Sequence, residues 1–164
     1  MVAVELLLII LFAGALDASD LAAAPVNETE CQISGLTVGS SYDEIVETLG
    51  DPDEEIPISV TNAPETMSKQ LKYHGLSIAT VSSLVTAMLS SGLEHSLASG
   101  IGPGSSRKDV LETLGKTKIQ YGDVREVFIY RCDGAKHRLG DTLLMITMTE
   151  GVVEAVAIAL RIEP

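Results

Sequence analysis

The sequence contains no tryptophan, and phenylalanine and tyrosine together make up only 4% of its 164 residues. Since 46% of the residues are hydrophobic, the chain can still bury a core, but that core must be mainly aliphatic. The length suits one domain or two small domains packed together.

Basic residues are absent from the first 68 positions, which hold thirteen Asp or Glu. Residues 69–164 hold ten acids and eleven Lys or Arg. The net charge of −12 argues against nucleic acid as a partner, because nucleic-acid binding needs a basic face to neutralise phosphates. The acidic half of the chain suits a basic partner or cations. The alternative is a solvated surface that serves solubility alone.

The amino-terminal segment lacks the basic start of a typical signal peptide, and Glu5 stands in its place. An apolar run of eleven residues follows, Leu6 to Leu16, which is shorter than the roughly 20 residues of a membrane span. Small-x-small cleavage signals occur at 13–15 and 22–24, although Pro25 directly after the second is awkward for cleavage. We predict that residues 1–24 are a signal peptide or amino-terminal apolar segment and that the protein is exported. The alternatives are a buried helix or strand and an uncleaved anchor, which would confine membrane contact to this segment.

Cysteine is scarce, with only Cys31 and Cys132, 101 residues apart. An exported protein with an even cysteine count suits one disulfide, which would close a large loop. Two separate buried thiols are the alternative. Lipid attachment at Cys31 is not expected, because Glu28-Thr29-Glu30 precedes it instead of small apolar residues.

Two sixteen-residue stretches resemble each other, Gly35 to Gly50 and Gly100 to Gly115, at an offset of 65 residues. Eight of the sixteen paired positions are identical. Each stretch predicts a short helix that begins at a serine with an acid three residues later, a capping box, and ends at a glycine. The expected caps are Ser41 and Ser106 at the starts and Gly50 and Gly115 at the ends. Helices this short need to pack on a sheet.

Alternating apolar and polar residues after each helix predict strands. In the first half, residues 71–74 and 76–81 are expected to form one strand, with a turn at Ser82-Ser83 and a partner strand at 84–89; a helix over 81–97 is the alternative. In the second half, strands are expected at 124–132, 142–149 and 152–162, with a hairpin signal at Asp133-Gly134. Residues 31–33 are expected to be a lead-in strand, and 51–64 a polar loop.

The sequence therefore predicts an α+β fold. It would consist of two tandem repeats, each a short helix (or helix pair) packed on an antiparallel β-meander. Residues 25–98 would form the first, acidic repeat and residues 99–164 the second, joined around residues 93–99.

The stretch from Gly35 to Pro52, followed by a tyrosine-bearing strand and a hairpin, resembles the SmpA/OmlA (BamE-like) domain. Two copies in tandem resemble the arrangement in the secreted β-lactamase-inhibitory protein. The resemblance covers residues 33–90 and 99–162, and it aligns Tyr73 and Tyr130 with the tyrosine of that family's first strand. It implies an extracytoplasmic, non-enzymatic role, either as a scaffold in outer-membrane barrel assembly or as an inhibitor that binds through a concave sheet face.

Residues of the kinds used in catalysis are present but not grouped. The three histidines, His74, His95 and His137, lack metal-ligand spacing. The serines before each predicted helix are expected to be caps rather than nucleophiles. The glycine-rich stretch 100–104 lacks the lysine of a phosphate-binding loop. We therefore predict no catalytic residue, no cofactor and no metal.

The leading hypothesis is an exported, non-enzymatic protein-binding or envelope-assembly module. Its partner would be another extracytoplasmic protein, secreted, periplasmic or in the cell envelope. The tentative binding face consists of Tyr73, His74, Tyr130 and Arg131. The alternative is a small extracytoplasmic hydrolase or metal-dependent enzyme that uses His74 or His137 with nearby acids. A third possibility is a structural module without a ligand.

Overall fold

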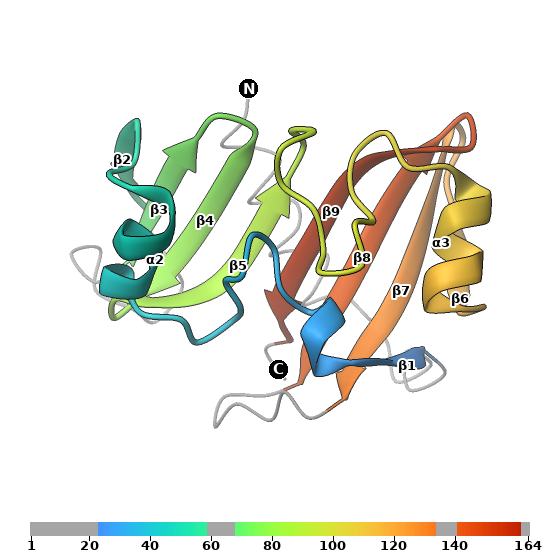
Figure 1. The fold of residues 1–164 in the computed structure, drawn as a ribbon, viewed down its shortest axis with the longest axis horizontal. Helices are drawn as coiled ribbons and strands as arrows, with labels where there is room; N and C mark the ends of the chain where they lie inside the picture. Colours follow the sequence, from blue (N-terminus) through green and yellow to red (C-terminus); the bar gives the residue numbers. More distant parts are fainter. Residues whose placement is uncertain (1–22, 59–67, 134–140, 162–164) are drawn as a thin grey trace.

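The structure is a computed structural model, and it describes residues 23–58, 68–133 and 141–161. These residues form one mixed β-sheet of nine strands with two α-helices and a short 3₁₀ helix (Figure 1). The strands lie in the order β1-β7-β8-β9-β5-β4-β3-β2, and β6 also pairs with β7. The elements are β1 Ala24–Asn27, η2 Glu28–Glu30, α2 Tyr42–Leu49, β2 Glu54–Pro57, β3 Ser68–Tyr73, β4 Leu76–Val81, β5 Leu84–Ser90, α3 Arg107–Leu114, β6 Lys118–Tyr121, β7 Arg125–Asp133, β8 Thr142–Thr149 and β9 Val152–Leu160.

Both helices begin at a capping box and end at a glycine. Ser41 accepts a hydrogen bond from the Glu44 amide and Glu44 accepts one from the Ser41 amide, which completes a capping box at the start of α2. Ser106 and Asp109 make the same box at the start of α3. Gly50 and Gly115 follow the last helical turns with a φ of 81° each, a backbone conformation that favours glycine.

The predicted fold class is wrong, because the strands do not form two separate helix-on-meander repeats. Strand β5 pairs antiparallel with β9, which joins both halves of the chain into one continuous sheet. The centre of this pairing is Leu89 opposite Ala157. Strand β1 then adds a parallel pairing with β7, so the sheet is mixed. The predicted boundary near residue 98 falls in the connection between β5 and α3.

Several predicted local elements also need correction. Residues 71–74 and 76–81 are not one strand, because a tight turn at His74-Gly75 separates β3 from β4. Residues 31–33 form no strand, and Ile33 makes only an isolated bridge with Leu36. The alternative helix over 81–97 is also wrong, since β5 occupies its centre. The acidic stretch expected to be a loop contains edge strand β2. Most of the predicted hairpin turn after Asp133 lies outside the described residues.

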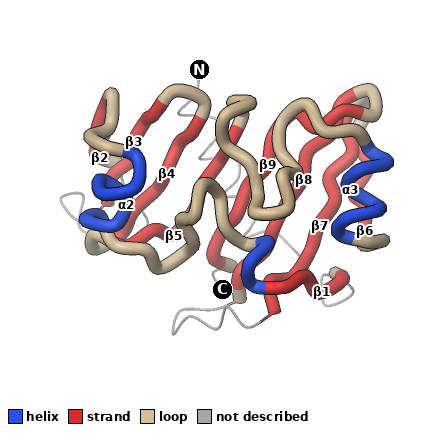
Figure 2. Tube along the Cα trace, in the orientation of Figure 1, coloured by secondary structure: helices blue, strands red, loops and turns tan. Residues whose placement is uncertain are grey.

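The two helices pack on the same face of the sheet (Figure 2). The buried residues there form one continuous cluster across both halves. Ile45 of α2 and Val110 of α3 are both 0% exposed and both belong to it. A second apolar cluster lies on the other side of the strands and consists mainly of small residues. Its members are Ala23, Ala79, Ala87, Leu89, Ile129, Leu143, Met145, Ala157 and Ala159.

Cys31 and Cys132 form a disulfide with an S–S distance of 2.04 Å, and both residues are buried. The bond joins the segment before α2 to β7, across 101 residues of chain. In the chain-entropy model, a closed loop of this size stabilises the fold by about 4.7 kcal/mol. Among the described residues, no helix is long and apolar enough to cross a membrane.

Candidate functional site

The four residues of the predicted binding face do not share one surface. Tyr73 and Tyr130 lie on β3 and β7, strands separated in the sheet by β4, β5, β9 and β8. Arg131 directly follows Tyr130 along β7, so the two side chains point to opposite faces. His74 lies in the exposed turn after β3. The structure therefore provides no single face built from these residues.

The two tyrosines instead hold the ends of the helices. The Tyr73 hydroxyl donates a hydrogen bond to the carbonyl of Gly50 at 3.1 Å, and the Tyr130 hydroxyl donates to the carbonyl of Gly115 at 2.8 Å. Tyr130 is fully buried, and this burial raises its pKa to about 12. Each hydroxyl thus satisfies a carbonyl at a helix end, which otherwise lacks a partner within the helix.

The described histidines do not form a reactive centre. His95 Nδ1 lies 2.8 Å from Ser34 Oγ, and His95 Nε2 lies 3.0 Å from the carbonyl oxygen of His74. A carbonyl can only accept, so Nε2 carries a proton, and the ring braces the connection between β5 and α3. The His74 ring makes no hydrogen bond or ion pair with the described residues, and His137 lies outside them. No group of three His, Cys, Asp or Glu among the described residues could hold a metal ion.

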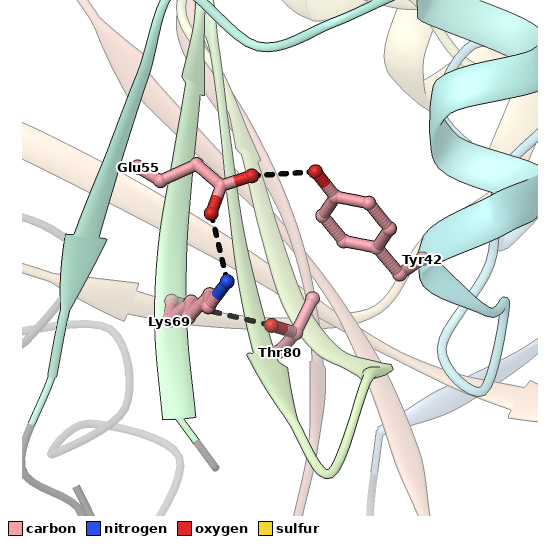
Figure 3. Close-up of polar contacts among 4 residues, drawn as sticks. All are labelled: Tyr42, Glu55, Lys69 and Thr80. Carbon is pink, nitrogen blue, oxygen red and sulfur yellow. Dashed lines mark hydrogen bonds and ion pairs between the residues drawn. The ribbon is translucent and has the colours of Figure 1, made fainter. Parts of the chain in front are cut away.

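A polar cluster connects the start of α2 to the edge of the sheet (Figure 3). It consists of Tyr42, Glu55 and Lys69, and we call it the α2 cluster. The Tyr42 hydroxyl donates to Glu55 Oε1 at 2.5 Å, and Lys69 Nζ lies 2.8 Å from Glu55 Oε2. The Lys69 ammonium is also 5.9 Å from the centre of the Tyr42 ring, within the range of a cation–π contact. Glu55 therefore uses both oxygens to fix two neighbours from different elements.

These contacts shift the pKa values of the cluster away from catalytic values. The hydrogen bond to Glu55, followed by burial, raises the pKa of Tyr42 to about 12. The hydrogen bonds from Lys69 and then Tyr42 lower the pKa of Glu55. A tyrosine that stays protonated and a carboxylate that stays ionised are poorly matched to proton transfer near neutral pH. The cluster therefore acts as a fixed polar surface rather than as an acid–base pair.

The acidic residues around the α2 cluster are mostly unpaired. Glu54 pairs with Lys72 at 2.8 Å, just as Glu55 pairs with Lys69. Glu44 caps the helix through its hydrogen bonds with Ser41. The remaining exposed acids of α2 and of the loop after it make no ion pair with any described residue. These unpaired acids are Asp43, Glu47, Asp51 and Asp53. The base of α2 is thus held by the contacts of the α2 cluster, and its exposed side carries unpaired acids.

The corresponding place beside α3 has a different charge pattern. Arg107 is the first residue of α3, as Tyr42 is of α2, and Glu126 lies four residues before Tyr130, as Lys69 lies four before Tyr73. Arg107 Nε pairs with Glu126 Oε2 at 3.1 Å and stacks over the Phe128 ring at 5.4 Å. The strand residue that contacts the start of the helix is therefore the base Lys69 beside α2 and the acid Glu126 beside α3.

Sequence reasoning missed the α2 cluster because it treated residues 51–64 as a loop and gave Lys69 no role. A usable signal was present. Lys69 is the first basic residue of the chain, and a first base after thirteen acids is a natural partner for one of them. What the sequence could not provide was the pairing of β2 with β3, which places Glu55 beside Leu71 and two residues from Lys69 along the ladder.

No protein-family model matches the sequence, and no curated protein matches it. Among solved structures, the chain is similar to a cysteine-rich secretory protein from Staphylococcus aureus, with a TM-score of 0.53 and 13% identity. The match covers 85% of this chain and 50% of that one, so this chain spans about half the length of its structural neighbour. An extracellular protein from Bacillus anthracis that contains an SCP domain gives a TM-score of 0.47, with 10% identity over 74% of this chain and 43% of that one.

These comparisons correct the predicted family. The chain shares its fold with the Staphylococcus aureus secretory protein, and its own strands form one continuous sheet instead of two separate helix-on-meander repeats. The resemblance to the SmpA/OmlA (BamE-like) domain in tandem is therefore wrong. What its motif described correctly is local, namely two capped helices of eight residues each. At 13% identity, the similarity to the Staphylococcus aureus protein concerns the fold alone.

Proposed function

We propose that this protein is exported and acts without catalysis, by binding a basic extracytoplasmic protein through the surface of α2. One observation carries the binding part of the proposal. Asp43 and Glu47 lie four residues apart on the exposed side of α2, and like charges at this spacing destabilise a helix by about 0.2–0.5 kcal/mol. At the same two positions of α3, Lys108 and Glu112 form an ion pair at 3.7 Å.

Because Asp43 and Glu47 make no ion pair with a described residue, their charge is available to a partner. Unpaired surface acids attract a positively charged partner and orient its approach, whereas paired charges have no such field. The α2 cluster supports this role, because it fixes the base of the helix without consuming its outer acids. A folded basic protein or a basic peptide suits this surface, whereas nucleic acid would be repelled by it.

Three features support export. The protein contains a buried disulfide between its only two cysteines, and such bonds persist in oxidising compartments. Its amino-terminal segment has the apolar run and the small residues of a signal peptide. Its structural neighbours are described as a secretory protein and an extracellular protein.

The contacts of the described residues support the non-enzymatic part of the proposal. They contain no metal-binding group of His, Cys, Asp or Glu. The nitrogens of His95 both face polar partners, and the two strongly shifted tyrosines stay protonated near neutral pH. No described contact of His74 favours the hydrolase or metal-dependent alternative.

The binding proposal is tested with one substitution made at matched positions. Glu47→Lys replaces the acid pair on α2, and Glu112→Lys makes the same charge change on α3. The tagged protein and both variants are cross-linked in intact cells, and the recovered partner is identified and quantified by mass spectrometry. We expect Glu47→Lys to reduce recovery of a basic partner about tenfold or more, and Glu112→Lys to leave recovery within about twofold.

Equal recovery by all three proteins would contradict a role for α2. Recovery of an acidic partner would contradict the charge argument. Fractionation of the same cells tests export separately, because an exported protein accumulates outside the cytoplasm with its disulfide intact. A reduced protein found only in the cytoplasm would overturn that part of the proposal.

A further inference from the structure

The chain contains one sequence motif that the proposed function does not use, Asn27-Glu28-Thr29. An asparagine followed two residues later by threonine, with no proline between them, is the acceptor motif of N-linked glycosylation in exported proteins. The chain has one other asparagine, Asn62, and Ala63 and Pro64 follow it, so the motif occurs only once. Because a three-residue motif also arises by chance, the surroundings of Asn27 decide whether it can be used.

All three residues of the motif are exposed. Asn27 is the last residue of β1, and the other two residues belong to the short helix η2 that follows. The motif lies between two buried residues, Val26 and Cys31, which belong to the larger core cluster. The fold therefore presents the motif to solvent while the chain on both sides of it stays packed in the core.

The two polar atoms of the Asn27 side chain have different surroundings. The oxygen, Oδ1, accepts hydrogen bonds from the amide of Thr29 at 3.1 Å and from the Thr29 hydroxyl at 3.3 Å. The nitrogen, Nδ2, makes no hydrogen bond with any residue that the structure describes. The side chain is thus oriented through its oxygen, and the nitrogen that receives a glycan in this reaction is available to a glycosyl donor.

The position of Asn27 in the sheet leaves room for a bulky group. Strand β1 lies at one edge of the sheet, and within the described part of the chain it pairs only with β7. Strand β2 forms the opposite edge, and α2 lies at that end of the molecule (Figure 1). A glycan on Asn27 would therefore not cover the surface of α2 through which we propose that the protein binds.

A glycan at this position would also protect the edge formed by β1. An open edge strand exposes backbone amides and carbonyls to which a strand of another molecule can add. N-linked glycans are bulky and increase solubility. A glycan at the end of β1 would keep strands of other molecules away from this edge.

We propose that Asn27 carries an N-linked glycan in the exported protein; this rests on the proposed export. The donor is a lipid-linked oligosaccharide whose first sugar is bound to a diphosphate. Asn27 Nδ2 attacks the anomeric carbon of that sugar, so that a carbon–nitrogen bond forms and the bond from this carbon to the diphosphate oxygen breaks. The lipid diphosphate leaves with the electron pair of the broken bond, and the amide nitrogen gives up one proton. The step needs no oxidant or reductant.

The test is the mass of the peptide that contains Asn27. The full-length protein with a carboxy-terminal tag is expressed in its natural host cell and purified from outside the cytoplasm, and its peptides are analysed by mass spectrometry. We expect the peptide with Asn27 to carry the mass of a glycan and the peptide with Asn62 to be unmodified. Exported protein without a glycan on Asn27 overturns the inference and leaves the proposed export intact. Protein found only in the cytoplasm overturns the proposed export, and this inference with it.

Two substitutions of Thr29 separate the motif from the fold. Thr29→Ser keeps the hydroxyl that the motif requires, whereas Thr29→Val has nearly the same shape without it. We expect Thr29→Ser to keep the glycan and Thr29→Val to lose it completely, as Asn27→Gln should. Both Thr29 variants should be exported with the disulfide intact, because the side chain is exposed. A glycan that persists in Thr29→Val or Asn27→Gln, or one that is lost from both Thr29 variants, overturns the assignment.

Discussion

The surroundings of α2 and α3 share one backbone framework and differ in the charges they present to solvent. The amide of Tyr42 donates to the carbonyl of Ser83 at 2.9 Å, and the amide of Arg107 donates to the carbonyl of Gly151, also at 2.9 Å. Both helices carry a capping box and both have a tyrosine hydroxyl on the carbonyl after the last turn. The exposed side of α2 nevertheless carries two acids without an ion pair, whereas the exposed side of α3 carries an ion pair at the same positions.

This difference separates what the fold requires from what it permits. The shared contacts are made by backbone groups, caps and buried side chains, and changing them would cost stability in either half. The differing contacts are made by exposed side chains, whose substitution usually changes stability by less than about 0.5 kcal/mol. Selection for function can therefore act on the surface of α2 while the framework stays constant.

The largest expected effect comes from breaking the covalent link between the halves. Replacing both cysteines, Cys31→Ala with Cys132→Ala, should lower the free energy of unfolding by about 2–5 kcal/mol, because the open chain regains the entropy of a large loop. Denaturant unfolding of oxidised parent and variant measures it. A loss below about 0.5 kcal/mol would contradict this expectation. It would mean that the unfolded chain without the disulfide is already about as restricted as the cross-linked one.

The helix cores come next. Ile45→Ala should cost about 2–5 kcal/mol and Val110→Ala about 1–3 kcal/mol, because both side chains are fully buried and the isoleucine loses more methyl and methylene groups. Ile45→Val, which makes the two positions alike, should cost about 0.5–1.5 kcal/mol. Equilibrium unfolding of the three variants tests this order. A larger loss from Val110→Ala than from Ile45→Ala would contradict the matched packing.

The two tyrosine hydroxyls should differ in importance. Tyr130→Phe leaves the half-buried Gly115 carbonyl without its partner and should cost about 1–3 kcal/mol, whereas Tyr73→Phe leaves the exposed Gly50 carbonyl open to water and should cost about 0.5–1 kcal/mol. Thermal unfolding of both variants measures the difference. Equal losses would show that solvent does not reach Gly50 when the hydroxyl is removed.

A smaller effect is expected at alkaline pH. The pKa of Tyr42 is raised to about 12 by its hydrogen bond to Glu55, so the folded state favours the protonated phenol. Its contribution to stability is present below the unfolded pKa near 10 and is lost as the pH rises from 10 to 12. After allowance for solvent screening at this exposed site, the loss should be about 0.5–1 kcal/mol.

The comparison of Tyr42→Phe with the parent isolates this loss from that of other alkaline groups. Free energies of unfolding at pH 9 and pH 11 should fall less in the variant than in the parent. Glu55→Gln should also reduce the fall, because it removes the charge that keeps the phenol protonated. An identical pH dependence in all three proteins would contradict the hydrogen bond.

The smallest stability effects belong to the charges that carry the proposed function. Glu47→Lys should stabilise the fold by about 0.2–0.5 kcal/mol, because Asp43 then precedes a lysine at a favourable spacing. Glu112→Lys should destabilise it by a similar amount, because Lys108 then faces a second lysine. Thermal unfolding at low salt measures both signs. Two changes of the same sign would contradict the assigned pairings.

The parts of the fold that could be predicted from the sequence are those set by neighbours in the chain. Ser41 and Glu44 are three residues apart, so one short stretch of sequence determines the start of α2. The apolar residues of 142–149, bounded by Gly140-Asp141 and Glu150-Gly151, likewise indicate β8 directly. Strand β1 could not be found in this way, because its partner β7 lies more than a hundred residues away. The β5–β9 pairing, which joins the two expected sheets into one, could not be predicted for the same reason, because its two strands are far apart in the sequence.

The candidate site shows the same limit. The acidity of the first half is visible in the sequence, where it suits a basic partner, cations or a solvated surface that serves solubility alone. The residues of the predicted binding face do not lie on one surface, and the hydroxyls of Tyr73 and Tyr130 donate hydrogen bonds to the carbonyls at the ends of the helices. The sequence does not indicate these two contacts. The α2 cluster depends on β2 pairing with β3, which a polar and proline-containing stretch does not indicate.

The most direct test of the account uses Thr48 and Thr113, identical exposed residues at the same position of α2 and α3. A photo-crosslinking amino acid is placed at one or the other in the exported protein, and intact cells are irradiated. We predict a covalent adduct with a basic protein from position 48, absent from position 113 and lost when Glu47→Lys is added. Adducts of equal yield from both positions, or an adduct from position 113 alone, would contradict it.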